Sequence, residues 1–243
     1  MPARTRSHST STRPLGRVLS SILVAILACG FLAQPAAATP PDRSRAVDPI
    51  ANAARYEQLA TDWWLWVLGT TTEKGGPFDA GPVLCAVNQP DPDVLFLAAP
   101  FNTSSTVERA CTDPVDAGTQ IFFPVITAEC SNREEDPFFG ETADDRRECV
   151  EDKLFNPSKL RVKVDGRSLA VSGRKYEFIP PDFAFESVEG NPTGLQETSG
   201  NSTARGNWVL LEPLSRGFHR IEFAGRYQKF PFSISVTYDL YVQ

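Results

Sequence analysis

The closing segment of the chain, residues 230–242 (FPFSISVTYDLYV), constrains the fold more than any other stretch. Apolar residues occupy every second position of this segment, and the residues between them are mostly polar. Because successive side chains of a β-strand point to opposite faces, the pattern predicts a strand with one buried and one solvated face. Such a strand needs a second layer over its apolar face. The apolar positions are Phe230, Phe232, Ile234, Val236, Tyr238, Leu240 and Val242.

Other segments also favour short strands, and turns rather than helices separate them. Asp165-Gly166 is a strong hairpin turn, and Pro124 indicates an edge strand or a bulge. About eight strands without alternating helices predict a mainly β protein, an antiparallel β-sandwich-like domain with an N-terminal α-helix packed on it and two disulfides. The clearest of these other strands are expected at residues 94–99, 119–127, 160–164 and 208–214.

Two helices and one long loop are expected between these strands. A long amphipathic helix should cover residues 49–68, with Asp48 as its N-cap and Gly69 in a left-handed conformation at its end. Thr142 and Asp145 form the pattern of a capping box, which predicts a short helix. Residues 189–206 are rich in Gly, Ser, Thr and Asn and predict a long exposed loop.

The long helix contains the segment TDWWLWVLGT, which holds three of the four tryptophans of the chain. At about 100° per residue, Trp63 and Trp66 share the apolar face of the helix. We expect these two side chains to anchor the helix to the sheet. Trp64 points to the side of that face and is the binding candidate.

The first 38 residues have the pattern of a secretory signal peptide. An Arg-rich start without acidic residues precedes an apolar run at residues 18–33 and small residues at 36–38. Cleavage after Ala38 is expected, and a lipoprotein cut before Cys29 is the alternative. The apolar run is shorter than a membrane span requires, so no membrane span is expected after cleavage.

Cleavage would leave a linker at residues 39–47 and a single β-rich domain at 48–243, with a disulfide-bearing part (48–157) and a β-rich part (158–243). The leader takes four of the 24 basic residues and none of the 30 acidic ones, which leaves a formal net charge of −10. An acidic surface of this kind argues against nucleic acid as a partner. The expected partner is an extracellular ligand, and the sequence does not specify the oligomeric state.

Four cysteines remain after cleavage, an even number that suits an oxidising compartment: Cys85, Cys111, Cys130 and Cys149. They allow three pairings, of which we favour Cys85 with Cys111 and Cys130 with Cys149. A zinc site of four cysteines is the alternative, but zinc ligands usually come in closely spaced pairs, and these cysteines are far apart in the sequence.

Catalytic and metal sites have only weak support. Asp79 and Glu129 lie beside apolar segments and form a candidate acid pair, in which burial would raise the pKa values. Acidic clusters such as residues 134–136 could hold a weak calcium ion, although no calcium-loop motif occurs and a solvated acidic face is favoured. No other metal or cofactor is expected. His219, in phase with Ile221 and Phe223, is read as a packed strand histidine.

Several segments, taken in order, resemble a family of secreted bacterial proteins without an assigned activity. The likeness covers residues 56–130 and 207–243 and implies secretion and a common fold, but it carries over no catalytic or binding residue. The segments are DWWLWVLG, PFDAGPVLCAVNQ, VLFLAAPF, VERACTDP, TQIFFPVITAEC and PLSRGFHRIEFAG…FSISVTYDLYV.

The sequence therefore favours a secreted or cell-envelope-associated domain that binds a ligand, a glycan or a protein without catalysis. An extracellular hydrolase that uses Asp79 and Glu129 is one alternative, and a purely structural envelope protein is another.

Overall fold

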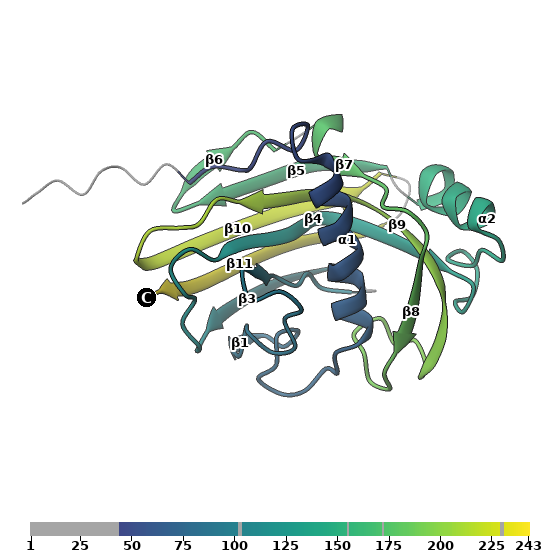
Figure 1. The fold of residues 1–243 in the computed structure, drawn as a ribbon, viewed down its shortest axis with the longest axis horizontal. Helices are drawn as coiled ribbons and strands as arrows, with labels where there is room; N and C mark the ends of the chain where they lie inside the picture. Colours follow the sequence, from purple (N-terminus) through teal and green to yellow (C-terminus); the bar gives the residue numbers. More distant parts are fainter. Residues whose placement is uncertain (1–43, 102–103, 155, 172, 229–230) are drawn as a thin grey trace, which may run out of the picture. The chain divides into compact units, whose positions relative to one another are not determined.

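Two β-sheets lie face to face in the computed structural model, and a helix covers the far side of one of them (Figure 1). The structure describes residues 44–101, 104–154, 156–171, 173–228 and 231–243. The expected signal peptide with Cys29, and most of the linker, lie outside the described residues. The mainly β fold with an N-terminal helix and two disulfides is confirmed.

The larger sheet contains, in spatial order, β1 (Gly81–Val83), β3 (Ser105–Cys111), β11 (Ser233–Val242), β10 (Gly217–Tyr227), β5 (Pro157–Val164) and β6 (Arg167–Leu169). β3 runs parallel to both β1 and β11, and the other neighbours are antiparallel. The closing segment forms β11 and alternates between buried and more exposed positions as predicted. Phe230 lies outside the described residues.

The smaller sheet contains, in spatial order, β2 (Val94–Phe96), β4 (Gln120–Ser131), β9 (Thr198–Leu211) and β7 (Glu177–Phe178), and β8 (Phe183–Ser187) also pairs with β9. Only β2 runs parallel to its neighbour among these described strands. The helices are α1 (Ala53–Leu68), α2 (Ala143–Glu148), the π-helix η1 (Cys149–Leu154) and the 3₁₀ helix η2 (Arg174–Tyr176).

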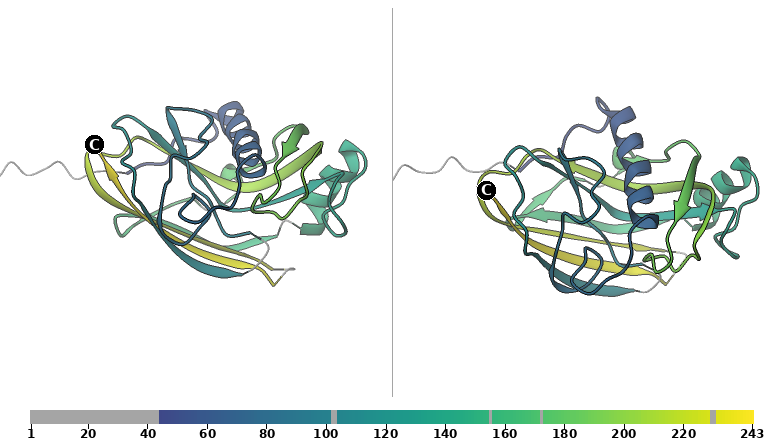
Figure 2. Two further views of the ribbon diagram at one scale, coloured as in Figure 1. Left: turned by 90° about the horizontal axis from the view of Figure 1, so that it is seen from below. Right: turned by 60° about the horizontal axis from the view of Figure 1, so that its bottom comes forward.

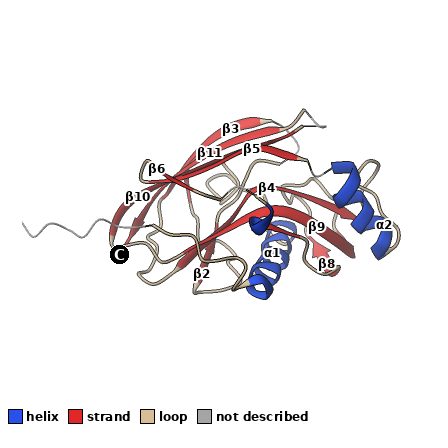
Figure 3. Ribbon diagram, turned by 90° about the horizontal axis from the view of Figure 1, so that it is seen from above, coloured by secondary structure: helices blue, strands red, loops and turns tan. Residues whose placement is uncertain are grey.

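The smaller sheet is buried on both faces, so the fold has three layers (Figure 3). Phe123 of β4 stacks on Phe223 of β10, with ring centroids 4.7 Å apart, in the core between the sheets. Phe122, the preceding residue of β4, faces α1 and stacks on Trp208. Figure 2 shows α1 against the sheet from two further sides. Burial on both faces explains why the β4 sequence is apolar almost without interruption.

The helix begins four residues later than predicted. Asp48 does not cap it; the carboxylate of Asp48 accepts a hydrogen bond from the Ile50 amide in a preceding turn. Asn52 takes the N-cap position, but its side chain does not cap the helix and instead donates to the Asp48 carbonyl oxygen; Gly69 ends the helix at φ −91°, outside the left-handed region. The short helix α2 does have the predicted capping box of Thr142 and Asp145. None of the helices in the described ranges has the length and apolar character that a bilayer span requires.

The predicted loop at residues 189–206 is wrong for its second half, because the 14-residue strand β9 begins at Thr198. Ser202 and Thr203 are buried in this strand, and their hydroxyls donate hydrogen bonds that satisfy them away from water. Gly200 and Gly206 allow close packing: a Cβ on Gly206 would lie 2.5 Å from the Trp208 ring. A polar and glycine-rich composition is thus compatible with a central strand here.

Both disulfides have the sequential pairing, Cys85 with Cys111 and Cys130 with Cys149. All four sulfurs are therefore oxidised, and the four-cysteine zinc site is wrong. The first bridge joins the end of β3 to the segment after β1, and the second joins β4 to η1. Each sheet contains strands from both the disulfide-bearing and the β-rich part, and the described residues belong to one compact unit.

Candidate functional site

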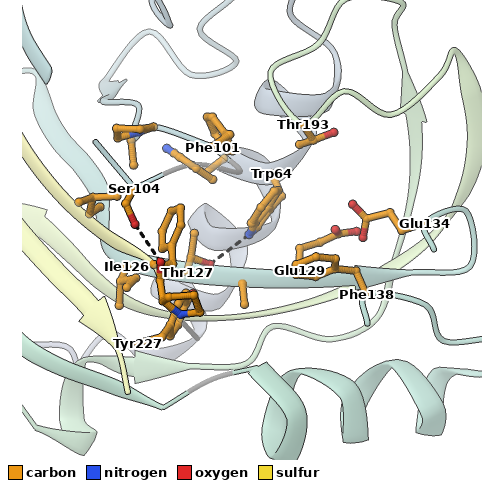
Figure 4. A pocket seen from close by; sticks show the side chains of 17 residues that line it. Trp64, Phe101, Ser104, Ile126, Thr127, Glu129, Glu134, Phe138, Thr193 and Tyr227 are labelled. Carbon is orange, nitrogen blue, oxygen red and sulfur yellow. Dashed lines mark hydrogen bonds between the residues drawn. The ribbon is translucent and has the colours of Figure 1, made fainter. Parts of the chain in front are cut away.

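A cavity of about 430 Å³ lies beside β4, between α1 and the adjoining ends of β10 and β11 (Figure 4). This volume falls within the range of pockets that hold small molecules. Its wall is mainly apolar and rich in aromatic side chains, and two carboxyl groups, from Glu129 and Glu134, line the same space. The aromatic residues of the wall are Trp63, Trp64, Phe101, Phe138, Tyr227 and Phe232.

The cavity exists because β2 is much shorter than β4. β2 pairs only with Gln120–Phe122 at the start of β4. From there to Ser131, which forms an isolated bridge with Phe139, no described strand pairs with this edge of β4. The side chains of the 99–101 segment and of Phe232 occupy part of the uncovered edge, and the cavity occupies the rest.

The bulge at Pro124 determines which side chains of β4 face α1. Before the bulge, Phe123 and Val125 lie in the core between the sheets. Past it, Ile126 lies on the inner side, packed near Tyr227, and Thr127 meets Trp64 of α1. The bulge thereby changes the alternation, and Glu129 falls on the same face as Thr127. Without it, Glu129 would point into the apolar core between the sheets.

Glu129 and Glu134 form a buried carboxyl pair. Glu129 accepts a hydrogen bond from the Ser202 hydroxyl and is hydrogen-bonded to the side chain of Glu134. Burial raises the pKa of Glu129, and burial together with the adjacent charge of Glu129 raises the pKa of Glu134 far above its usual range. Two carboxylates in contact in an apolar site repel each other strongly, so the pair retains a proton at neutral pH.

A polar network and a disulfide hold the segments next to the carboxyl pair in place. Arg146 of α2 binds Asp182 through two hydrogen bonds of 2.7 and 2.8 Å, and Asp182 also accepts a 2.8 Å bond from Thr203 of β9. Cys130, the neighbour of Glu129, is bonded to Cys149. Arg146 is thus already paired, although its charge still favours ionisation of Glu129.

Trp64, which helical geometry places to the side of the apolar face, is buried, with 5% of its surface accessible. Its indole Nε1 donates a 3.3 Å hydrogen bond to Thr127, and its ring meets Trp63 edge-on at 5.2 Å. The expectation assumed one buried face of α1, whereas Phe101 covers the helix from the side at which Trp64 emerges. Trp64 nevertheless lines the cavity, as does Trp63.

Asp79 and Glu129 are not brought together in the cavity. Asp79 accepts hydrogen bonds from the backbone amides of Gly75 and Ala80, which lower its pKa, and it does not line the cavity. The raised pKa expected for a buried acid is found at Glu129 but not at Asp79. The carboxyl group that does meet Glu129 is Glu134, which the sequence placed in a possible calcium cluster.

Glu134 was missed as a partner of Glu129, although only four residues separate them in the sequence. Their spacing of five residues has no meaning in a strand, and only the turn that follows Ser131 brings them together. Within the described residues, no group of three or more acidic, histidine or cysteine side chains could hold a metal ion.

His219 is packed in β10, and its two ring nitrogens contact the Asp165 carboxylate and the Ser215 carbonyl oxygen, each at 2.8 Å. This is the packed strand histidine that was expected, with a partner in the hairpin turn that the sequence did not identify. It does not line the cavity.

Comparison with known proteins gives only weak likenesses. No protein family model and no curated protein matches the chain. The structure of PbICP-C in complex with falcipain-2 is similar at 8% identity and a TM-score of 0.27, over 62% of this chain and 99% of that chain. The cysteine protease inhibitor EhICP2 from Entamoeba histolytica is similar at 10% identity and a TM-score of 0.21, over 62% and 96%. Likenesses of this strength carry no argument about function.

The carboxyl pair should reduce stability at high pH. Glu134→Gln is expected to raise the free energy of unfolding at pH 8, on the order of 1 kcal/mol, with little change at pH 4.5. Between the ordinary pKa of 4.5 and the raised value of about 10, the unfolded chain releases a proton that the folded chain keeps. The stability that this group contributes is complete below pH 4.5 and is lost as the pH rises through that window.

Urea unfolding of the wild type and the variant at both pH values measures this effect. The exposed neighbour Glu135 provides the control, Glu135→Gln, for which the pH dependence should match the wild type. An unchanged pH slope in Glu134→Gln would show that the pair does not hold its proton in the folded state.

Proposed function

We propose that this protein is an exported, non-catalytic domain that binds a small apolar ligand in the cavity beside β4. The observation that carries this proposal is a cavity of about 430 Å³ with a mainly apolar, aromatic-rich wall in which Glu129 and Glu134 are the only acidic or basic side chains among the described residues. Apolar walls with few polar groups that orient the ligand are typical of small-molecule sites. The pattern of the leader and the two disulfides support an extracytoplasmic location.

The rigidity of the walls also supports binding. Trp63 and Trp64 are held by hydrogen bonds to Leu97 and Thr127, and Glu129 lies next to a disulfide-bonded cysteine. A ligand that enters such a site meets side chains already in place, which reduces the entropy lost on binding.

An acid-pair hydrolase is the second candidate, now with Glu129 and Glu134 in place of Asp79 and Glu129. The raised pKa values favour it, because a general acid needs a proton at neutral pH. The contact distance argues against glycoside hydrolysis, since retaining and inverting enzymes keep their carboxyls about 5 Å or more apart. We therefore favour binding over catalysis.

Calorimetric titration with a neutral aromatic alcohol, 2-(1-naphthyl)ethanol, tests the proposal. We expect one site with a dissociation constant on the order of 0.1–1 mM, which is typical of a probe of this size. Ala128 lines the cavity, so Ala128→Phe should fill the space and abolish binding. Ala184 is exposed on β8, and Ala184→Phe should bind as the wild type does.

The melting temperature of each variant shows whether it is folded. Absence of binding in the folded wild type, or equal binding in folded Ala128→Phe, would contradict the proposal and favour a purely structural role.

A further inference from the structure

We propose that the cavity selects ligands that carry one protonated amine on an apolar body, with the ammonium group held at Glu129 and Glu134. This inference rests on the proposed function and names the chemical class of the ligand. Both carboxyls line the cavity together with the aromatic side chains of Trp64 and Phe138 (Figure 4), and no described basic side chain lines it.

Glu134 carries a buried hydrogen-bond acceptor that lacks a donor among the described residues. Glu134 Oε2 is buried, and no described residue donates a hydrogen bond to it. A buried acceptor of this kind costs free energy unless a ligand or water supplies the donor. Glu129, by contrast, already accepts the Ser202 hydroxyl. The unmet hydrogen-bonding capacity of the cavity therefore lies at Glu134, on the acceptor side.

The wall of the cavity also lacks a positively charged side chain among the described residues. No described Lys, Arg or His lines the cavity. Arg146, the cation that acts on Glu129, is bound to Asp182, and Arg133 donates its Nε hydrogen to the Ser199 carbonyl. A ligand ammonium would supply both the donor and the positive charge that the pair lacks, and charged hydrogen bonds are stronger than neutral ones.

The aromatic side chains of the wall also suit an amine with an apolar body. Trp64, Phe101 and Phe138 share the cavity with the two carboxyls. Aromatic faces attract cations, and they also accommodate the apolar body of an amine. An anionic ligand would instead face two carboxyls and no basic side chain, so the same wall disfavours it. The acidic balance of the chain acts in the same direction at longer range.

Binding of the amine should release a proton. The free pair holds a proton between the two carboxyls, and an ammonium ion allows both to ionise, so the proton passes to the buffer. The other titratable or charged groups near the pair are Arg146 of α2, Asp182 before β8, Arg133 on the pair's own loop and Tyr227 of β10. At Asp182, burial is outweighed by hydrogen bonds from Arg146 and Thr203, which lower its pKa, and burial raises the pKa of Tyr227, so the carboxyl pair is the proton source.

The test compares 2-(1-naphthyl)ethylamine with 2-(1-naphthyl)ethanol, two probes of the same size. At pH 7 the amine is expected to bind about tenfold more tightly than the alcohol, because it makes a charged hydrogen bond. Calorimetry in phosphate and in Tris, which differ in ionisation enthalpy, should show protons released with the amine and none with the alcohol. Glu134→Gln and Glu129→Gln should each reduce the preference to less than about twofold.

Glu186 is exposed on β8, and Glu186→Gln is the matched control that should keep both the preference and the proton release. If the alcohol binds but the amine binds no better, the ligand class is wrong while the proposed function stands. If neither probe binds, the proposed function itself fails. An amine preference that persists in both folded Gln variants would place the ammonium elsewhere and overturn the inference.

Discussion

Trp63→Ala is expected to lower the free energy of unfolding by about 3–5 kcal/mol, the largest effect of any single substitution proposed here. Trp63 is fully buried at the junction of α1, β9 and the 97–101 segment. Its ring contacts those of Trp64, Phe101 and Trp208 at centroid distances of 5.2 to 5.9 Å. Truncation would leave a cavity that these neighbours cannot fill without moving the helix.

The substitution also leaves a buried acceptor without its donor. The Trp63 indole Nε1 donates a 3.0 Å hydrogen bond to the Leu97 carbonyl oxygen. Trp63→Phe should therefore lose less stability than Trp63→Ala, since it keeps most of the apolar volume and loses chiefly this bond. Urea unfolding followed by circular dichroism measures both, and Phe218→Ala, at an 85% exposed position, is the control. A loss of less than about 1 kcal/mol in Trp63→Ala would contradict the role of Trp63 as anchor.

Arg109→Met is expected to cost about 3 kcal/mol or more, although it replaces a charged residue with an apolar one of similar length. The Arg109 side chain of β3 is buried, and its guanidinium donates to three backbone carbonyls, those of Phe78, Asp79 and Ala98. It also lies 5.4 Å from the centre of the Tyr238 ring. Methionine fills much of the space but removes all three donated bonds, so the Phe78 and Asp79 carbonyls lose the guanidinium donor and the Ala98 carbonyl keeps only Tyr238 Oη.

The consequence should extend to the cavity. Tyr238 Oη donates to the same Ala98 carbonyl and accepts from the Ala98 amide, so Arg109 and Tyr238 together fix the segment that leads to Phe101. We expect weaker binding of the naphthyl alcohol in Arg109→Met in addition to the lower stability. Arg220→Met, which breaks the exposed pair of Arg220 with Asp239, is the control and should change the stability little. Equal effects in the two variants would contradict the role assigned to Arg109.

The sequence predicted those elements whose burial follows a simple period. β11 alternates because one face meets the core, and β4 is apolar from Ile121 to Ile126 because both of its faces are covered there. The sequential pairing of the disulfides also agrees with the structure. In each case the sequence pattern that predicts the feature lies within one stretch of the chain, because neighbouring positions there share one environment.

The errors arise where distant segments determine the environment. The burial of Trp64 stayed open because a helical projection does not contain Phe101, which lies 37 positions further along the chain and covers that side. The first half of β9 looked like a loop because Ser202 and Thr203 use their hydroxyls inside the structure. Composition cannot distinguish a hydroxyl that meets water from one that meets a buried carboxylate.

The cavity could not be predicted, because it depends on a mismatch in length and a shift in register. β2 ends while β4 continues, and the bulge at Pro124 then turns Glu129 toward the space that is left. Pro124 correctly predicted the bulge. To predict where the Glu129 side chain points, however, one must also know the register between β4 and β9. The carboxyl pair is also unfavourable for stability at neutral pH, which is common for groups kept for function.

The most direct test of the central claim, that the cavity beside β4 is a ligand site, is an NMR titration of the four indole N–H signals with 2-(1-naphthyl)ethanol. Trp63 and Trp64 line the cavity, whereas Trp66 and Trp208 do not, so the protein contains its own control. We expect the Trp64 signal to shift most, followed by that of Trp63, with a saturable dependence on the concentration of the probe. The Trp66 signal should remain nearly unchanged. Absence of a saturable shift at Trp64, or a larger shift at Trp66, would contradict the account.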